Sequence, residues 1–322
     1  KMLDIACRIE GLARHPSQES PPVTVLTWLR IAFILLLIAA NCLVHVVPVV
    51  VLGVVKAVLP FAAVRRACNP LLTGLAESWI AVNTAMMGAF TDTGFDVLLD
   101  PGADLRRDGH YLVLANHQSW VDILVLQKVF NRRIPLLRFF LKRQLFWVPL
   151  LGLAWWALDF PFMGRYSKRE IARNPELGKR DMEATRRACA KFVDIPVSVM
   201  NFVEGTRYTA DKHAGQASPY RHLLKPKSGG VAFVLDAMGQ GLHAIVDVTI
   251  AYPGGRPSMM DLMANRVPQV IVQVRQRPIP AELVEGDYQS DRAFRARFQQ
   301  WMNGVWQDKD TDLDRLLGQR QD

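Results

Sequence analysis

Two short polar clusters hold the residues whose types and spacing could do chemistry. The first, NHQSWVD, places His117 five positions before Asp122, directly after the apolar run YLVLA. On one helix the two side chains would point about 140° apart, but with His117 in a loop and Asp122 in the first helical turn the carboxylate can fold back onto the imidazole. Such a carboxylate fixes the tautomer and stabilises the imidazolium that forms when histidine removes a proton. The spacing therefore predicts a general base.

The same residues also fit a purely structural role. Ser119 and Asp122 have the spacing of a capping box, in which the aspartate satisfies backbone N–H groups at a helix start. His117 would then be an ordinary loop histidine. The two interpretations are compatible, since one aspartate can order a helix start and still face a histidine.

The second cluster is FVEGTR, residues 202–207, which also follows an apolar run. Gly205 lets the backbone turn tightly and approach a ligand, while the Thr206 hydroxyl, backbone amides and the Arg207 guanidinium together suit a phosphate monoester. A surface turn with a solvated arginine is the alternative. The sequence contains neither a GxSxG nor a GxxxxGK pattern, so nothing supports a covalent serine hydrolase or a P-loop enzyme.

Alternating elements must position these clusters. Strands are expected at 95–99, 111–115, 196–202, 244–251 and 269–274, and helices at 69–90, 119–130, from 174 and from 291. This alternation predicts an α/β fold with a mixed central sheet flanked by helices. Reactive groups of such folds gather where strands end and helices begin, as both clusters do. Gly239 and Gly241 resemble a dinucleotide loop but precede a strand, which predicts a simple turn.

An uncharged run from residue 31 to residue 55 precedes this fold. At about 1.5 Å per residue it is long enough to cross a hydrocarbon core, which predicts a membrane anchor. Pro48 lies inside the run and the flanking basic residues are nearly balanced, so the positive-inside rule fixes no topology. A hairpin broken at Pro48 and a single spanning helix both stay open, and a buried core helix is the third possibility.

The 322 residues are half hydrophobic and carry a net charge of +9. This composition excludes a disordered chain and predicts an anionic partner. Residues 123–158 lack Asp and Glu and interleave basic with aromatic side chains, a pattern that fits single-stranded nucleic acid or anionic lipid headgroups. Because of the anchor we expect the lipid surface and no nucleic acid, with an apolar helix pair as the alternative for 147–157. The four cysteines lack CxxC spacing, which predicts neither disulfides nor a zinc site.

Together the motifs resemble the glycerolipid acyltransferases, the 1-acylglycerol-3-phosphate (lysophosphatidic acid) acyltransferases of the PlsC type. NHQSWVD resembles the family's NHxxxxD block and FVEGTR its EGT(R) block; FPFMGR, residues 160–165, lies near its second block and VTIAYP, residues 248–253, resembles its last. The blocks occur in the family's order over about residues 90–255. The long apolar region and the LDFPFMGRYSK stretch look most similar to a bacterial YihG-like branch.

The resemblance implies a reaction. His117, oriented by Asp122, would take the proton from the sn-2 hydroxyl of lysophosphatidic acid as it attacks an acyl thioester, acyl-CoA or acyl carrier protein, giving phosphatidic acid. It implies no bound cofactor, no metal, and attachment to a bacterial inner membrane with the catalytic domain facing the cytoplasm. The residues expected to bind substrate are Glu204, Gly205, Thr206, Arg207, Arg165 and Lys142.

We therefore expect four segments: a tail (1–22), a membrane-anchoring helical segment (23–67), the acyltransferase domain (68–285) and a C-terminal amphipathic helix (286–322). One alternative is acyl transfer to another acceptor: glycerol-3-phosphate, a lysophospholipid or an amino-lipid. Another is a non-catalytic basic membrane-surface protein, against which the intact histidine–aspartate spacing with EGTR argues.

Overall fold

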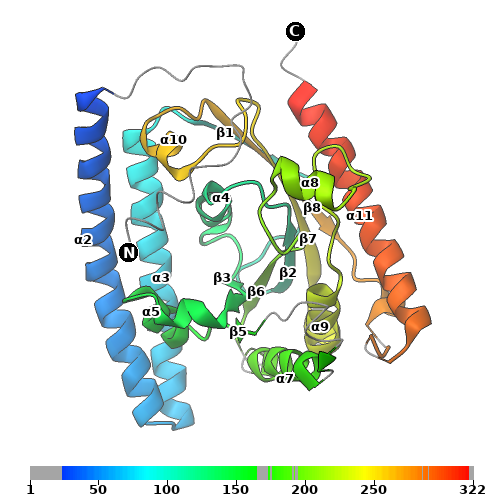
Figure 1. The fold of residues 1–322 in the computed structure, drawn as a ribbon. Coiled ribbons are helices and arrows are strands. Elements are labelled where there is room, and N and C mark those ends of the chain that lie inside the picture. The colour runs from blue at the N-terminus through cyan, green and yellow to red at the C-terminus, as the bar shows by residue number, and fades with distance from the viewer. Residues whose placement is uncertain are drawn as a thin grey trace.

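The computed structural model describes residues 24–164, 173–174, 176–190, 192, 195–284, 286–288 and 290–318. Its strands are β1 Gly94–Leu99, β2 His110–Ala115, β3 Leu137–Phe139, β4 Leu141–Lys142, β5 Phe162–Met163, β6 Val197–Phe202, β7 Ala244–Ala251 and β8 Gln269–Arg277. Six of them form a central sheet in the order β1-β8-β7-β2-β6-β3 (Figure 1). The pair β7–β8 is antiparallel and the other pairs of this sheet are parallel, which confirms the predicted mixed sheet.

Helices cover both faces of this sheet. The helices of the described residues are α2 Val25–Val58, α3 Ala62–Phe90, α4 Val121–Phe130, α5 Leu151–Ala157, α7 Glu176–Ala190, α8 Ala210–Gly215, α9 Gly229–Met238, α10 Met259–Met263 and α11 Arg292–Gly318. Alternate residues of β2 point to opposite faces. Leu112 and Leu114 pack into one apolar core with α9 and α11, while Tyr111, Val113 and Ala115 pack into another with α4. This is why the strand reads as a continuous apolar run.

The N-terminal helices α2 and α3 run side by side along one flank of the molecule (Figure 1). Of the topologies left open at Pro48, the hairpin broken at the proline does not form: α2 continues through Pro48 and the chain turns back at residues 59–61. Val46 and Val49, on either side of the proline, are buried against α3, and this packing outweighs the lost backbone hydrogen bond. Since α3 begins at Ala62, the expected boundary at residue 67 falls inside a helix.

Part of the segment 147–157 packs as the apolar-helix alternative describes: residues 151–157 form a helix against α2, whereas Trp147 is 81% exposed. This helix, α5, lies against α2 so closely that a Cβ on Gly53 would stand 2.4 Å from the Cβ of Ala157. Lys56 Nζ, near the end of α2, donates to Asp159 Oδ2 at 2.6 Å and to Ala157 O at 2.9 Å. These contacts fix α2 to the segment that follows α5. The three helices α2, α3 and α5 together form the helical flank of the molecule.

The C-terminal helix α11 packs its apolar face into the core beside α9. The short 3₁₀ turn Gly239–Gly241 joins α9 to β7, which confirms that the glycine pair there is a turn. Among the described residues, α2 is the helix long and apolar enough to cross a membrane.

Candidate active site

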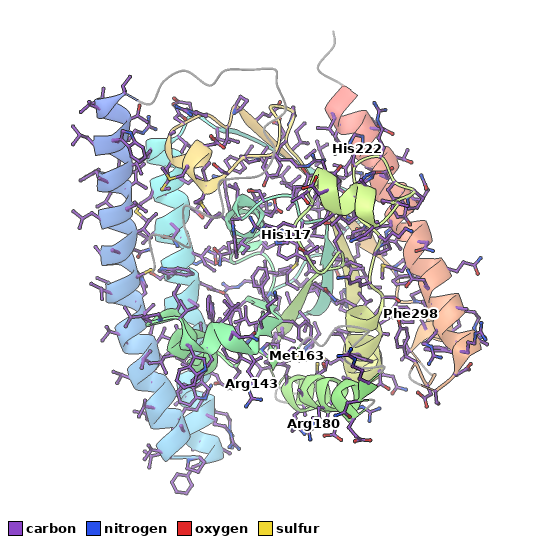
Figure 2. All side chains as sticks on the ribbon, viewed as in Figure 1. His117, Arg143, Met163, Arg180, His222 and Phe298 are labelled. Carbon is purple, nitrogen blue, oxygen red and sulfur yellow. The ribbon has the colours of Figure 1, made fainter. Side chains whose placement is uncertain are left out.

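Parallel neighbouring strands bring the two polar clusters together. Ala115, the last residue of β2, is in register with Phe202, the last residue of β6. The chain segments that leave these strands therefore begin side by side at one edge of the sheet. His117 lies between the helical flank and the sheet (Figure 2).

The predicted histidine–aspartate pair forms. His117 Nδ1 lies 2.9 Å from Asp122 Oδ2, and Asp122 is fully buried. The same carboxylate oxygen accepts the N–H groups of Gln118 at 2.6 Å and Ser119 at 2.8 Å, while Oδ1 accepts the Tyr252 hydroxyl at 2.6 Å. One aspartate thus orders the start of the helix and holds the imidazole, so the two interpretations of this motif describe a single arrangement.

This pairing sets the tautomer of His117. A carboxylate can only accept, so Nδ1 carries the proton and Nε2 keeps its lone pair. Within the described part of the chain, no hydrogen bond engages Nε2. The Phe202 ring stacks on the imidazole at 3.8 Å between centroids, and the Tyr208 N–H donates to His117 O at 2.8 Å. The imidazole is held on one edge and one face, with a basic nitrogen left available.

Glu204 lies beneath this pair. Its buried carboxyl group accepts the His117 N–H at 2.9 Å and the Leu224 N–H at 3.0 Å. Burial raises the pKa of Glu204 to about 8. The negative charge of Asp122 also raises this pKa, whereas the two N–H hydrogen bonds and the positive charge of Lys309 lower it. Glu204 therefore contacts the backbone of His117, whereas the next residues of its motif reach the surface.

A cavity of about 520 Å³ adjoins His117, within the size range of ligand sites. The helical flank supplies apolar walls from α2, α3 and α5, among them Val46, Ala76 and Ala154. The sheet edge and its neighbouring loops supply polar and basic lining residues: His117, Lys142, Gly205, Thr206 and Arg207. The cavity can therefore hold a ligand that is apolar along most of its length and anionic at one place.

The motif around Gly205 is shaped for close approach. Gly205 has φ +69°, a left-handed conformation that glycine adopts at little cost. Thr206 Oγ1 accepts from Lys212 Nζ at 2.8 Å, and the Arg207 guanidinium lies 4.6 Å from the centre of the Trp120 ring. In the part of the chain that is described, neither Arg207 nor Lys142 forms an ion pair with a carboxylate. Both cations are available to an anionic ligand.

Of the expected binding residues, Gly205, Thr206, Arg207 and Lys142 line the cavity together, and Arg165 lies outside the described residues. Sequence reasoning missed Tyr252 and Asn116. Asn116 bridges β2 to β7 by donating to Ile250 O and accepting from Ile250 N, both at 2.9 Å. Both residues lie inside the motif blocks, and this position is the signal that could have found them, although neither was among the residues to which a chemical role was assigned.

Residues 101–253, which include most of this site, match the family model described as Acyltransferase. This part of the chain is thus similar to the acyltransferase family. The chain is 26% identical to mouse 1-acyl-sn-glycerol-3-phosphate acyltransferase epsilon, over 59% of this chain and 56% of the relative. It is 24% identical to mouse 1-acyl-sn-glycerol-3-phosphate acyltransferase gamma, over 62% and 52%.

The chain spans little more than half the length of these curated relatives. Among solved structures it resembles the 1-acyl-sn-glycerophosphate acyltransferase PlsC from Thermotoga maritima, with a TM-score of 0.48 and 16% identity over 88% of this chain and 98% of the other. The YihG-like branch stays a prediction.

Proposed function

We propose that this protein moves an acyl group from a thioester to the sn-2 hydroxyl of 1-acyl-sn-glycerol-3-phosphate, giving phosphatidic acid. The observation that carries the proposal is the His117–Asp122 pair, which adjoins a cavity with both a basic and an apolar lining. The names of two relatives, both 1-acyl-sn-glycerol-3-phosphate acyltransferases, support this acceptor. The donor is acyl-CoA or acyl carrier protein.

The chemistry begins at the free nitrogen of His117. Nε2 takes the proton of the acceptor hydroxyl while the oxygen attacks the thioester carbonyl, and Asp122 stabilises the imidazolium. The new C–O bond forms, the C–S bond breaks, and the departing thiolate takes the proton back from His117. A positioned base of this kind contributes about 10²–10⁴ in rate. The thioester supplies the activation, so the proposal includes neither a metal nor a covalent enzyme intermediate.

Arg207 and Thr206 bind the acceptor phosphate in this proposal. A guanidinium can donate two parallel hydrogen bonds to a phosphate, and the Thr206 hydroxyl can donate a third. Lys212 lies within 2.8 Å of Thr206 Oγ1, and Lys142 lines the same cavity. Burial lowers the pKa of Lys212, and the nearby charges of Arg207 and Lys142 lower it further. An anionic group bound there would relieve this repulsion.

The apolar walls of the cavity bind an acyl chain in this proposal. Each methylene moved from water into such a wall contributes about 0.8 kcal/mol. Because α2, α3 and α5 form these walls, the same helical flank would hold the acyl chain and attach the protein to a bilayer.

We also propose that α2 anchors the protein in the membrane. Its 34 residues would extend about 51 Å, more than the hydrocarbon thickness of a bilayer. Along its outer face it exposes large apolar side chains, including Trp28, Phe33 and Leu36. We place the anchor in the bacterial inner membrane, with the catalytic domain on the cytoplasmic side where acyl thioesters are made.

An acceptor panel tests the function. Purified protein in phospholipid nanodiscs is given radiolabelled palmitoyl-CoA or palmitoyl carrier protein, with lysophosphatidic acid, glycerol-3-phosphate, a lysophospholipid or a lyso-amino-lipid as acceptor. We expect the highest kcat/KM with lysophosphatidic acid and a product that co-migrates with phosphatidic acid. Preference for an acceptor without a phosphate monoester would overturn the proposed substrate.

A further inference from the structure

The C-terminal helix α11 reaches the active site through one peptide group. Trp306 is fully buried, and its indole N–H donates to Leu224 O at 3.1 Å. The N–H of the same residue, Leu224, donates to Glu204 Oε1 at 3.0 Å, and the other Glu204 oxygen accepts the His117 N–H at 2.9 Å. Three consecutive hydrogen bonds, two of them buried and the third partly buried, thus join Trp306 to the backbone of His117.

Two neighbours of Trp306 on α11 hold the same region. Asp310 accepts the backbone N–H groups of Arg221 at 2.7 Å and His222 at 2.8 Å, just before Leu224. Lys309 is fully buried and donates to Val248 O at 2.6 Å in β7. The helix therefore contacts both the 221–224 segment and the sheet, which fixes one relative to the other.

The position of Glu204 depends on this support. Its side chain is buried, so a shift of the Leu224 peptide would leave a carboxyl oxygen without its donor and let the carboxyl group turn. That turn would release the His117 N–H and move the imidazole. Displacements of about 1 Å at a reacting group can lower rates by about 10²-fold.

We propose that Trp306 is a positioning residue of the active site: through the Leu224 peptide and Glu204 it holds the His117 backbone in the geometry needed for proton transfer. Only the expected effect on the reaction rate rests on the function proposed above; the expected effect on hydrogen exchange does not. Trp306 lies outside the 101–253 match, so the catalytic motifs of this chain depend on a helix beyond them.

The test compares two variants of α11. Trp306→Phe keeps a large ring and removes the indole N–H. Phe298→Leu, the control, trims another fully buried ring of α11. Phe298 has no polar side-chain atom that could join the chain of hydrogen bonds, and it lies well away from His117 in Figure 2. Each is assayed in nanodiscs below its melting temperature, with steady-state kinetics and with hydrogen–deuterium exchange of the peptide that contains His117.

We expect Trp306→Phe to lower kcat about tenfold, to change the acceptor KM less than twofold, and to speed amide exchange at residues 116–118 about tenfold. Phe298→Leu should lower the melting temperature and leave both readouts within twofold of the wild type. Should Trp306→Phe fail to fold, Asp310→Asn, which weakens the hold on residues 221–222, is measured in its place with the same expectation.

Unchanged exchange at residues 116–118 in the folded Trp306→Phe protein would overturn the proposal, as would equal changes in Phe298→Leu. The exchange readout needs no substrate. If the wild type did not acylate lysophosphatidic acid, the proposed function would fail while the exchange comparison still tested the link from Trp306 to His117.

Discussion

The sheet edge and the helical flank form opposite sides of one site by different physical means. At the sheet edge each reactive side chain is held by directed hydrogen bonds, three of them on Asp122 Oδ2 alone. On the helical flank the cavity walls are apolar side chains such as Val46 and Ala154, held by packing. Directed bonds fix atoms to within tenths of an ångström, which proton transfer needs, whereas packed walls set a volume, which is enough to select a chain length.

The largest effect is expected at the sheet edge, from Asp122→Asn. An amide cannot accept on its nitrogen, so at least one of the donors around this side chain would lose its acceptor and the His117 tautomer would no longer be fixed. We expect kcat to fall by about 10²–10⁴ in the radiolabelled acyl-transfer assay. Asp211→Asn, at the exposed start of α8, is the control. A loss of less than threefold in Asp122→Asn would show that directed bonds do not set the rate.

The second effect separates binding from chemistry at the same edge. Arg207→Ala removes the charge-assisted hydrogen bonds that the guanidinium would donate to the phosphate. We therefore expect the KM for lysophosphatidic acid to rise about 10- to 100-fold and the KM for the thioester to stay within twofold. The exposed Arg106→Ala is the control. An unchanged acceptor response would remove Arg207 from the phosphate site.

The third effect belongs to the helical flank. Ala76 lies on α3 and lines the cavity, so Ala76→Phe should shorten the space for the acyl chain. Each excluded methylene costs about 0.8 kcal/mol, or about fourfold in kcat/KM, and a series of thioesters should shift its optimum to shorter chains. Leu71→Phe, on the exposed face of α3, should leave the series unchanged. An unshifted optimum in Ala76→Phe would place the acyl chain elsewhere.

The fourth effect concerns stability. Burial raises the pKa of Glu204 to about 8, from about 4.3 in an unfolded chain. Between these values the folded protein keeps a proton that the unfolded chain releases. This group's contribution to the free energy of unfolding is therefore greatest below about pH 4.3 and is lost as the pH rises through 8, by at most about 1.4 kcal/mol per unit.

Glu204→Gln removes that titration. Urea midpoints measured from pH 5 to pH 8 should fall less steeply in the variant than in the wild type. Parallel curves would mean that Glu204 titrates in the folded protein at its ordinary pKa.

The two sides of the site also differ in how much the sequence predicts. His117, Asp122 and Arg207 follow apolar runs that mark buried strands, so their types and places were predictable, and the structure brings them to one edge. Tyr252 lies in a motif block, but its contact with Asp122, like that of Leu224 with Glu204, depends on strand order and loop path, which no local pattern encodes.

For the helical flank, the sequence predicted the apolar composition but did not predict where the chain turns back. The apolar run predicts a long helix, and Pro48 predicts a break by its local chemistry. The helix continues because α3 packs on both sides of the proline. This tertiary contact cannot be predicted from the sequence of the segment alone. The same limit applies to Trp306, whose link to His117 passes through residues distant in the chain.

The central claim is that His117 is the base of an acyl transfer to lysophosphatidic acid. The direct measurement is phosphatidic acid formation from labelled acyl-CoA by the wild type, by His117→Ala and by His243→Ala, whose imidazole lies 3.6 Å from Asp104 near the opposite end of β7. We predict product from the wild type and His243→Ala, and a loss of about 10²–10⁴ in His117→Ala with its fold intact by circular dichroism. Undiminished turnover by His117→Ala would contradict the account.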